Sequence, residues 1–273
     1  MVGHSFLKTK SRTSYIDAQN YPSPAFDVAS VAANIVDASA GLSEYAIESY
    51  FARLSLAYKD RYVVNATIRT DGSSRFAAND RWGFFPSFSA AYRISEEAFF
   101  EPLRKTVDNL KIRLSYGSLG NQQIGYYDFI QTITTKGSMG DYSFDGTILG
   151  QHATVSDPVS GNQTWEKVIS KNLCADLNMF SNRLSLTADF YIRDTKDMLT
   201  AGIALPATYG ADSPKMNSAD LRTKGYELSL NWRDEFQLLR RPFSYSVTLT
   251  FNDYVSNITK FDNPDRSFAK KYY

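Results

Sequence analysis

The sequence has few of the residues that build disulfides, metal centres or acid–base sites. In 273 residues it holds one cysteine, Cys174, and two histidines, His4 and His152. A single cysteine excludes an internal disulfide and a multi-cysteine metal site. The histidines lie far apart in the chain, and neither neighbours a carboxylate pair that could complete a metal centre or a catalytic triad. We therefore expect Cys174 to be a small packed side chain, and we expect no enzyme activity and no cofactor.

Excess charge and long hydrophobic runs are also missing. The net charge is +1, so no basic field suggests a nucleic-acid partner. No window of about 18 apolar residues predicts a transmembrane helix, because the best candidate, residues 25–42, contains Asp27, Asn34 and Asp37. The opening MVGHSFLKTK lacks the apolar region of a signal peptide. The mean hydropathy of -0.35 remains compatible with a membrane barrel, in which alternate residues face lipid.

Aromatic residues, by contrast, are abundant, and the apolar residues follow a period of two. Phenylalanine, tyrosine and tryptophan make up 14% of the chain. Between residues 50 and 59 alternate side chains are apolar and the others are mostly polar, which predicts a strand with one apolar face. The apolar set is Tyr50, Ala52, Leu54, Leu56 and Tyr58. The same alternation recurs at 62–69, 87–94, 110–116, 184–193, 226–233 and 245–252.

These patterns predict eight strands of unusual length. They lie near residues 45–58, 62–71, 84–94, 110–117, 165–180, 184–193, 223–233 and 243–255. Strands of soluble sheets average about five or six residues, whereas a strand that crosses a bilayer needs about 9–11. Tyr58 and Tyr62 flank a short polar turn, where an aromatic girdle would meet a membrane interface.

The predicted connections alternate in length along the chain. Residues 59–61 and 181–182 form tight turns, and 95–109 and 234–242 are intermediate. Residues 72–83, 118–164 and 194–222 are long. Outer-membrane barrels have short periplasmic turns and longer extracellular loops. The alternation therefore favours a transmembrane barrel over a soluble sandwich.

Several long motifs occur in series and carry a family resemblance. DGSSRF begins at Asp71, RWGFFPSFSAAYRISEEAFF at Arg81 and LKIRLSYGSLGNQ at Leu110. TWEKVISKNLCADLNMFSNRLSLTADFYIRDTKDML begins at Thr164 and KGYELSLNW at Lys224. In this order they resemble the barrel of SusC/RagA-type TonB-linked outer-membrane transporters, over roughly residues 50–251. The expected fold is all-β: a partial antiparallel transmembrane β-barrel, with about 8–10 strands of a roughly 22-stranded plugged barrel.

The domain organisation follows from the strand pattern. We expect residues 1–44 to be an irregular segment that could hold the end of a strand, with a barrel loop at 16–41 and a short helix near 28–35. Residues 45–255 are expected to form the barrel portion, and 256–273 a truncated loop or strand. Eight strands in 45–255 correspond to about 26 residues each, so a complete barrel would need more than about 500. We therefore expect a chain truncated at both ends.

The candidate site residues fall into two groups. Five arginines lie on the polar strand faces, where they would face the barrel lumen: Arg53, Arg69, Arg93, Arg113 and Arg193. They could pair with Asp71, Asp189 or Glu227, or contact a plug domain or a polar substrate. Five aromatic residues lie in or beside long loops: Trp82, Tyr126, Tyr127, Tyr142 and Trp165. They could bind a glycan or a peptide, or belong to the outer aromatic girdle.

Two glycine-containing segments could be mistaken for phosphate loops. Residues 72–76 lack the strand–loop–helix context of a phosphate site, so they predict a structural turn. Residues 117–122 follow a strand, and we expect positive φ at Gly117 or Gly120.

The resemblance implies a function and partners for the complete protein. SusC-like proteins are plugged barrels of the Gram-negative outer membrane that import oligosaccharides or peptides. The resemblance implies energy from the TonB–ExbB–ExbD complex through a plug that this sequence lacks. It also implies a SusD-like surface lipoprotein and contact with outer-membrane lipid. Two other hypotheses stay open: a TonB-dependent siderophore or cobalamin receptor, and a soluble all-β carbohydrate-binding module.

Overall fold

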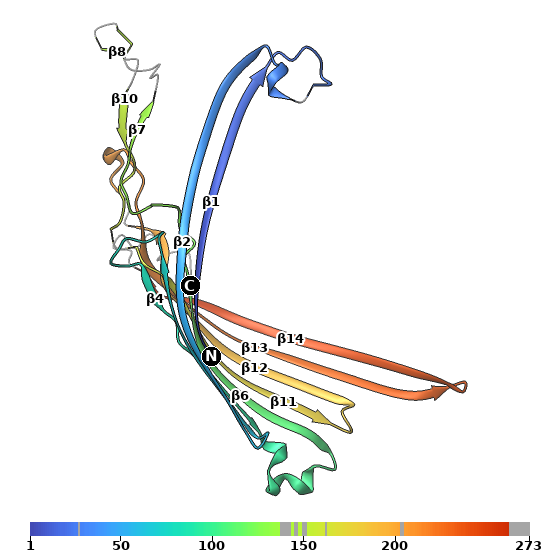
Figure 1. The fold of residues 1–273 in the computed structure, drawn as a ribbon. Helices are drawn as coiled ribbons and strands as arrows, with labels where there is room; N and C mark the ends of the chain where they lie inside the picture. The colour runs from blue at the N-terminus through green and yellow to red at the C-terminus, as the bar shows by residue number, and fades with distance from the viewer. Residues whose placement is uncertain are drawn as a thin grey trace.

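The chain forms one large antiparallel sheet in a computed structural model that describes residues 1–26, 28–136, 143–144, 147–148, 152–161, 163–202 and 205–261. The sheet has 10 strands in the order β1-β2-β3-β5-β6-β11-β12-β13-β14, with β4 paired to β3. Neighbours in space follow one another along the chain, as in an up-and-down barrel. The order does not close on itself, so the sheet is an open part of a barrel, and Figure 1 shows it strongly curved.

The elements have the following bounds. The sheet contains β1 (Val2–Gln19), β2 (Asn34–Tyr58), β3 (Tyr62–Ser73), β4 (Trp82–Phe84), β5 (Ser87–Arg93), β6 (Val107–Asn121), β11 (Glu166–Met179), β12 (Leu184–Ala201), β13 (Lys215–Leu238) and β14 (Arg241–Phe261). Outside it, β7 (Ile133–Lys136) pairs with β10 (His152–Val155), and β8 (Ser143–Phe144) with β9 (Thr147–Ile148). Short 3-10 helices are η1 (Ala29–Val31), η2 (Ile94–Glu96), η3 (Ala98–Leu103) and η4 (Ala207–Tyr209).

The predicted all-β antiparallel barrel fold is confirmed, and a strand lies at each of the eight predicted positions. Most strands extend beyond their predicted bounds, and β12 reaches Ala201 instead of residue 193. The predicted strand 84–94 is divided into β4 and β5, because Pro86 has no N–H to donate to the sheet. The predicted connection 234–242 is wrong. It is almost entirely strand, and the turn is only Leu239 and Arg240, both with positive φ as in a type I′ hairpin.

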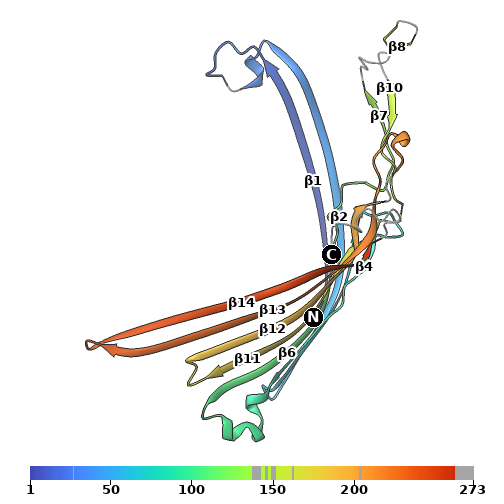
Figure 2. The ribbon, with the colours of Figure 1, turned by 180° about the vertical axis from the view of Figure 1, so that it is seen from behind.

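The predicted loop at 16–41 is correct only in its centre, where residues 20–33 join β1 to β2 and contain the short helix η1 within the predicted range 28–35; residues 16–19 and 34–41 are strand. Residues 2–19 and 34–52 form a hairpin whose strands pair from Gln19 with Asn34 to Val2 with Ala52. Both faces of this hairpin are largely exposed along its outer part, and it projects beyond the rest of the sheet in Figures 1 and 2. A strand whose two faces meet the same surroundings needs no apolar/polar alternation, so the sequence carried no strand signal here. Residues 262–273 lie outside the described residues.

The tight turns all lie at one end of the sheet, together with the longer connection 94–106, and the remaining loops lie at the opposite end. Residues 59–61, 94–106, 180–183 and 239–240 join strands at one end, and 20–33, 74–81, 122–165 and 202–214 at the other. Figure 1 shows the two sets separated along the strands. Lys59 and Asp60 both have positive φ, which matches the right-handed twist of the strands they join. We call these the short-turn end and the long-loop end.

The apolar face of the sheet is not covered by any other described part of the chain. Side chains that are register partners lie on the same face, and one row runs Leu56, Val64, Ala90, Leu114, Leu173, Phe190 and Tyr226. Leu54 is 57% exposed, and Phe88, Leu114, Leu173 and Phe190 are also exposed. A water-soluble monomer rarely exposes so large a contiguous apolar area.

The buried apolar core lies instead at the long-loop end. It consists of Phe76, Phe85, Ile124 and Trp165, with Leu199 packed against it. We call this the rim cluster. Gly117 and Gly120 do not have the positive φ that we expected. A Cβ at Gly120 would collide with the rings of Phe85 and Trp165, so glycine is required there for close approach.

The two faces of β2 provide a first test. In a full-length barrel that contains this chain, Leu54→Arg is expected to block stable membrane insertion, because a charge on a lipid face costs about 2–4 kcal/mol at mid-bilayer. Arg53→Leu, one residue away on the opposite face, is the matched control and is expected to insert normally. Heat-modifiable migration of the membrane fraction measures both. Equal insertion of the two variants would contradict the assignment of the faces.

Candidate functional site

The sheet register gathers the five predicted arginines on one face. Arg53 and Arg193 belong to a single row, which runs Arg53, Thr67, Ser87, Gly117, Ser170, Arg193 and Thr223. Arg69, Arg93 and Arg113 lie an even number of residues from members of this row, so their side chains share its face. We call it the polar face. It is opposite to the apolar face described above.

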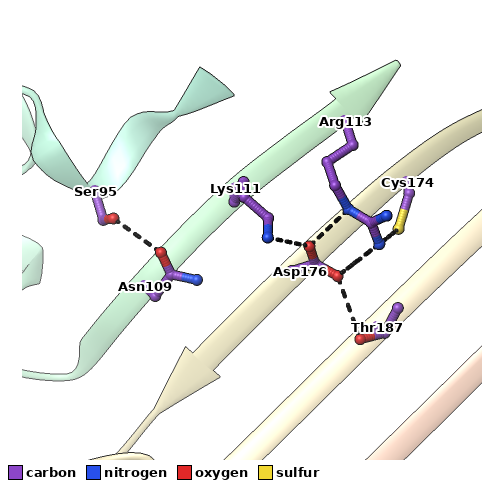
Figure 3. Close-up of polar contacts among 7 residues, drawn as sticks. All are labelled: Ser95, Asn109, Lys111, Arg113, Cys174, Asp176 and Thr187. Atoms are coloured by element: carbon purple, nitrogen blue, oxygen red, sulfur yellow. Dashed lines mark hydrogen bonds and ion pairs between the residues drawn. The ribbon is translucent and has the colours of Figure 1, made fainter. Parts of the chain in front are cut away.

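One polar network on this face surrounds Asp176 of β11 (Figure 3). Arg113 of β6 donates from Nε to Oδ2 at 2.8 Å and from Nη2 to Oδ1 at 3.0 Å. Nζ of Lys111 lies 3.0 Å from Oδ2, and the hydroxyl of Thr187 on β12 is 3.4 Å from Oδ1. The carboxylate therefore ties together three adjacent strands with two cations and one hydroxyl.

Cys174 is part of this network. Its side chain is 2% exposed, and Nη2 of Arg113 donates a hydrogen bond to its sulfur. It is a free cysteine, and the expectation of a small packed side chain is confirmed.

The other arginines differ in how strongly they are held. Arg69 donates from Nε to both carboxylate oxygens of Asp71 at 2.8 Å and from Nη2 to the buried hydroxyl of Ser49 at 3.1 Å. Arg93 lies 3.3 Å from Glu96 at the short-turn end. Arg53 and Arg193 have no ion pair within the described part of the chain. These two exposed guanidiniums are therefore the free cations of the row.

The carboxylate partners also differ from the expected set. Asp71 pairs with Arg69 as expected, but Arg113 pairs with Asp176 and not with Asp189 or Glu227. Asp189 and Glu227 face each other in the register of β12 and β13. Oδ1 of Asp189 is buried and has no hydrogen-bond partner among the described residues. Which carboxylate an arginine reaches depends on the stagger between neighbouring strands, because Arg113 is the register partner of Cys174 and reaches Asp176 two residues further along β11. The sequence alone does not specify this stagger.

The predicted loop aromatics separate into buried and exposed residues. Trp165 is 4% exposed within the rim cluster and donates Nε1–H to the carbonyl of Arg81 at 2.9 Å. It stabilises the rim and is not free to contact a ligand. Trp82, Tyr126 and Tyr127 are exposed. Tyr142 lies outside the described residues.

Tyr126 and Tyr127 border a hollow at the long-loop end, with a volume of about 920 Å³. The hollow also contains Asp128, Asp157 and Asp212 in its lining. Rings beside carboxylates can stack on sugar rings and accept hydrogen bonds from hydroxyl or amide groups. We call it the outer hollow.

Sequence reasoning missed a residue that positions the outer hollow. The guanidinium of Arg75 lies over the rings of both Tyr45 and Tyr126, at 4.3 and 4.8 Å from their centroids, and these two rings also contact each other. It also donates to the carbonyls of Gln122 at 3.3 Å and Ile124 at 2.9 Å. Arg75 thereby fixes the turn after β3 against the segment that carries Tyr126. A lone arginine among small residues in DGSSRF was the available signal.

No three His, Cys, Asp or Glu side chains in the described ranges are grouped so as to hold a metal ion. Within the same ranges, no helix is long and apolar enough to cross a membrane.

The comparisons with known proteins agree with this geometry. Residues 2–271 match the family model described as TonB dependent receptor-like, beta-barrel. The chain belongs to this family. It is 36% identical over 190 residues to a TonB-dependent receptor of Formosa agariphila, covering 69% of this chain and 18% of that protein. It is 30% identical over 225 residues to the TonB-dependent receptor SusC of Bacteroides thetaiotaomicron, covering 80% of this chain and 21% of that protein. The SusC resemblance is confirmed.

Solved structures match the fold over nearly the whole chain. The structure of the RagAB peptide transporter superimposes with a TM-score of 0.81 at 24% identity, covering 96% of this chain and 28% of that chain. A second structure, of the RagAB peptide importer in its closed-closed state, gives a TM-score of 0.79 at 25% identity over 95% of this chain. The chain spans about a quarter or less of the relatives and structures named here.

The Asp176 network generates a stability prediction. In the full-length barrel, Asp176→Asn leaves Arg113 and Lys111 without their counter-charge and is expected to lower the free energy of unfolding by about 1 kcal/mol, since the partners are partly exposed. Thr187→Val is the milder control, because it removes only the 3.4 Å contact. Denaturant unfolding in detergent micelles measures both. A larger effect for Thr187→Val would contradict the central role of the carboxylate.

The position of Arg75 generates a second prediction. Arg75→Lys keeps the charge but loses the planar group that stacks and donates at two points. We expect the segment 122–126 of the full-length barrel to be cleaved faster by an added protease. Arg12→Lys, on the exposed face of β1, is the matched control and is expected to leave the cleavage rate unchanged. An unchanged rate in Arg75→Lys would show that the clamp does not hold this segment.

Proposed function

We propose that this chain is part of an outer-membrane transporter that imports oligosaccharides or peptides with energy from the TonB complex. The observation that carries the proposal is the pair of opposite faces, one apolar and one polar, on a single antiparallel sheet. The apolar face is exposed over most of the sheet, and the polar face carries the arginines and the Asp176 network. In a barrel the first would contact lipid and the second would line the lumen.

The proposal assigns the two ends of the sheet to the two sides of the membrane. The short-turn end lies in the periplasm and the long-loop end faces the cell exterior. The outer hollow then opens toward the medium, where a SusD-like lipoprotein would cover it. Arg53 and Arg193 are free to contact a plug domain or a polar substrate inside the barrel. The plug, in turn, would connect the transporter to TonB–ExbB–ExbD.

The two other hypotheses have less support. A soluble carbohydrate-binding module would have to bury its apolar residues, and here Leu54, Phe88 and Phe190 are exposed on one face. A siderophore or cobalamin receptor would share the barrel, but SusC is among the relatives at 30% identity. The named solved structures include a peptide importer, so peptides stand beside oligosaccharides as substrate classes.

Ligand binding by the outer hollow is tested with Tyr127→Ala in the full-length transporter. Its ring is 44% exposed at the hollow, and one aromatic contact contributes about 0.5–1.5 kcal/mol, so affinity is expected to fall about two- to thirteenfold. Tyr209→Ala is the matched control, because Tyr209 is an exposed tyrosine at the same end that does not line the hollow.

The measurement is calorimetric titration with mixed oligosaccharides, mixed peptides and ferric chelates in separate arms. Saturable binding of a chelate alone would overturn the proposal in favour of the siderophore hypothesis. Equal loss in the two tyrosine variants would remove the outer hollow as the binding site.

A further inference from the structure

The apolar face carries charged side chains where β11, β12 and β13 approach the long-loop end. On β12 the residues of this face are Leu184, Leu186, Ala188, Phe190 and Ile192, followed by Asp194 and Lys196. The apolar part thus covers nine residues, about the length that crosses a bilayer. The next two positions are charged. The upper border of the apolar band therefore lies at Ile192 on this strand.

Basic side chains collect at that border. Lys171 of β11 and Lys224 of β13 are both register partners of Ile192, one on each side, and both are exposed. Adjacent strands are about 4.8 Å apart, so the two lysine stems start about 10 Å from each other. Lys167, Lys196 and Arg222 extend the group toward the long-loop end on the same face. We call Lys167, Lys171, Lys196, Arg222 and Lys224 the outer basic patch.

Only part of this charge is neutralised inside the protein. Arg222 pairs with Asp194, and Lys196 lies 2.7 Å from Asp220. Both carboxylates are buried and already engaged. Lys167, Lys171 and Lys224 have no ion pair among the residues that the structure describes. Five basic and two acidic side chains leave an excess of three positive charges.

The excess of positive charge is confined to β11, β12 and β13. The row that contains Lys171 and Lys224 continues through Tyr116, Phe88, Ala66 and Leu54 without a charge. Lysines on a lipid-facing surface extend their alkyl stems along apolar groups and place the ammonium at the head-group level. Cations that all reach this level on three neighbouring strands form a local anion site and not a uniform collar.

We propose that the outer basic patch binds the phosphate groups of the phosphorylated glycolipid in the outer leaflet, with its acyl chains along Leu173 and Phe190. Phosphate oxygens accept charge-assisted hydrogen bonds from lysine, and acyl chains need the adjoining exposed apolar band. A free anion would gain only the first contribution. The inference rests on the proposed function, because it requires the long-loop end to face the outer leaflet.

The test uses the purified full-length transporter in detergent, titrated with bisphosphorylated lipid A, with enzymatically dephosphorylated lipid A and with inorganic phosphate. The double variant Lys171→Gln/Lys224→Gln removes the two border charges. Lys59→Gln/Lys105→Gln is the matched control, because both lysines are exposed at the short-turn end. We expect the patch variant to bind lipid A about tenfold more weakly and the control to bind like wild type. Heat-modifiable migration verifies that each variant forms a barrel.

The contrary outcomes separate the two proposals. Equal lipid A affinity in wild type and the patch variant, or equal binding of dephosphorylated lipid A, overturns the patch while the barrel stands. Displacement of lipid A by equimolar inorganic phosphate would indicate a free-anion site and also overturns it. A wild-type protein that stays soluble without detergent and shows no heat-modifiable migration overturns the proposed function itself.

Discussion

Antiparallel register is the constraint on which the rest of this structure depends. Because side chains alternate, a slip of one residue would move every side chain of a strand to the opposite face. The pairing of Leu56 with Val64, and onward to Tyr226, keeps the apolar face continuous across seven strands. The same pairing keeps Arg53 and Arg193 together on the polar face. One geometric rule therefore separates the two environments without any interior core in the sheet.

The connections enforce that register differently at the two ends. At the short-turn end, tight turns such as Leu239–Arg240 fix it locally by their backbone twist. At the long-loop end, contacts between distant segments take over. Trp165 bonds to the carbonyl of Arg81, and Arg75 holds the carbonyls of Gln122 and Ile124. Packing in the rim cluster therefore holds the long loops in one arrangement, and in that arrangement they line the outer hollow.

The polar face shows what the apolar/polar alternation of the sequence can predict and what it cannot. Alternation was sufficient to place five arginines on one face, because face depends only on position along a strand. It was not sufficient to name their partners. Arg113 reaches Asp176 on the adjacent strand, while Asp189 lies one strand further away. Partner choice depends on the stagger between strands, which no single strand encodes.

The sequence by itself determined the strand positions from Tyr50 onward, the polar and apolar faces, and the family, since each depends on local alternation or on contiguous motifs. Tertiary structure decided the β1–β2 hairpin, whose two exposed faces leave no periodicity, and the burial of Trp165 within the rim cluster. It also decided that Lys171, Lys224 and Arg222 meet at one border. These residues are more than 50 positions apart at the extremes, and only cross-strand pairing brings them together.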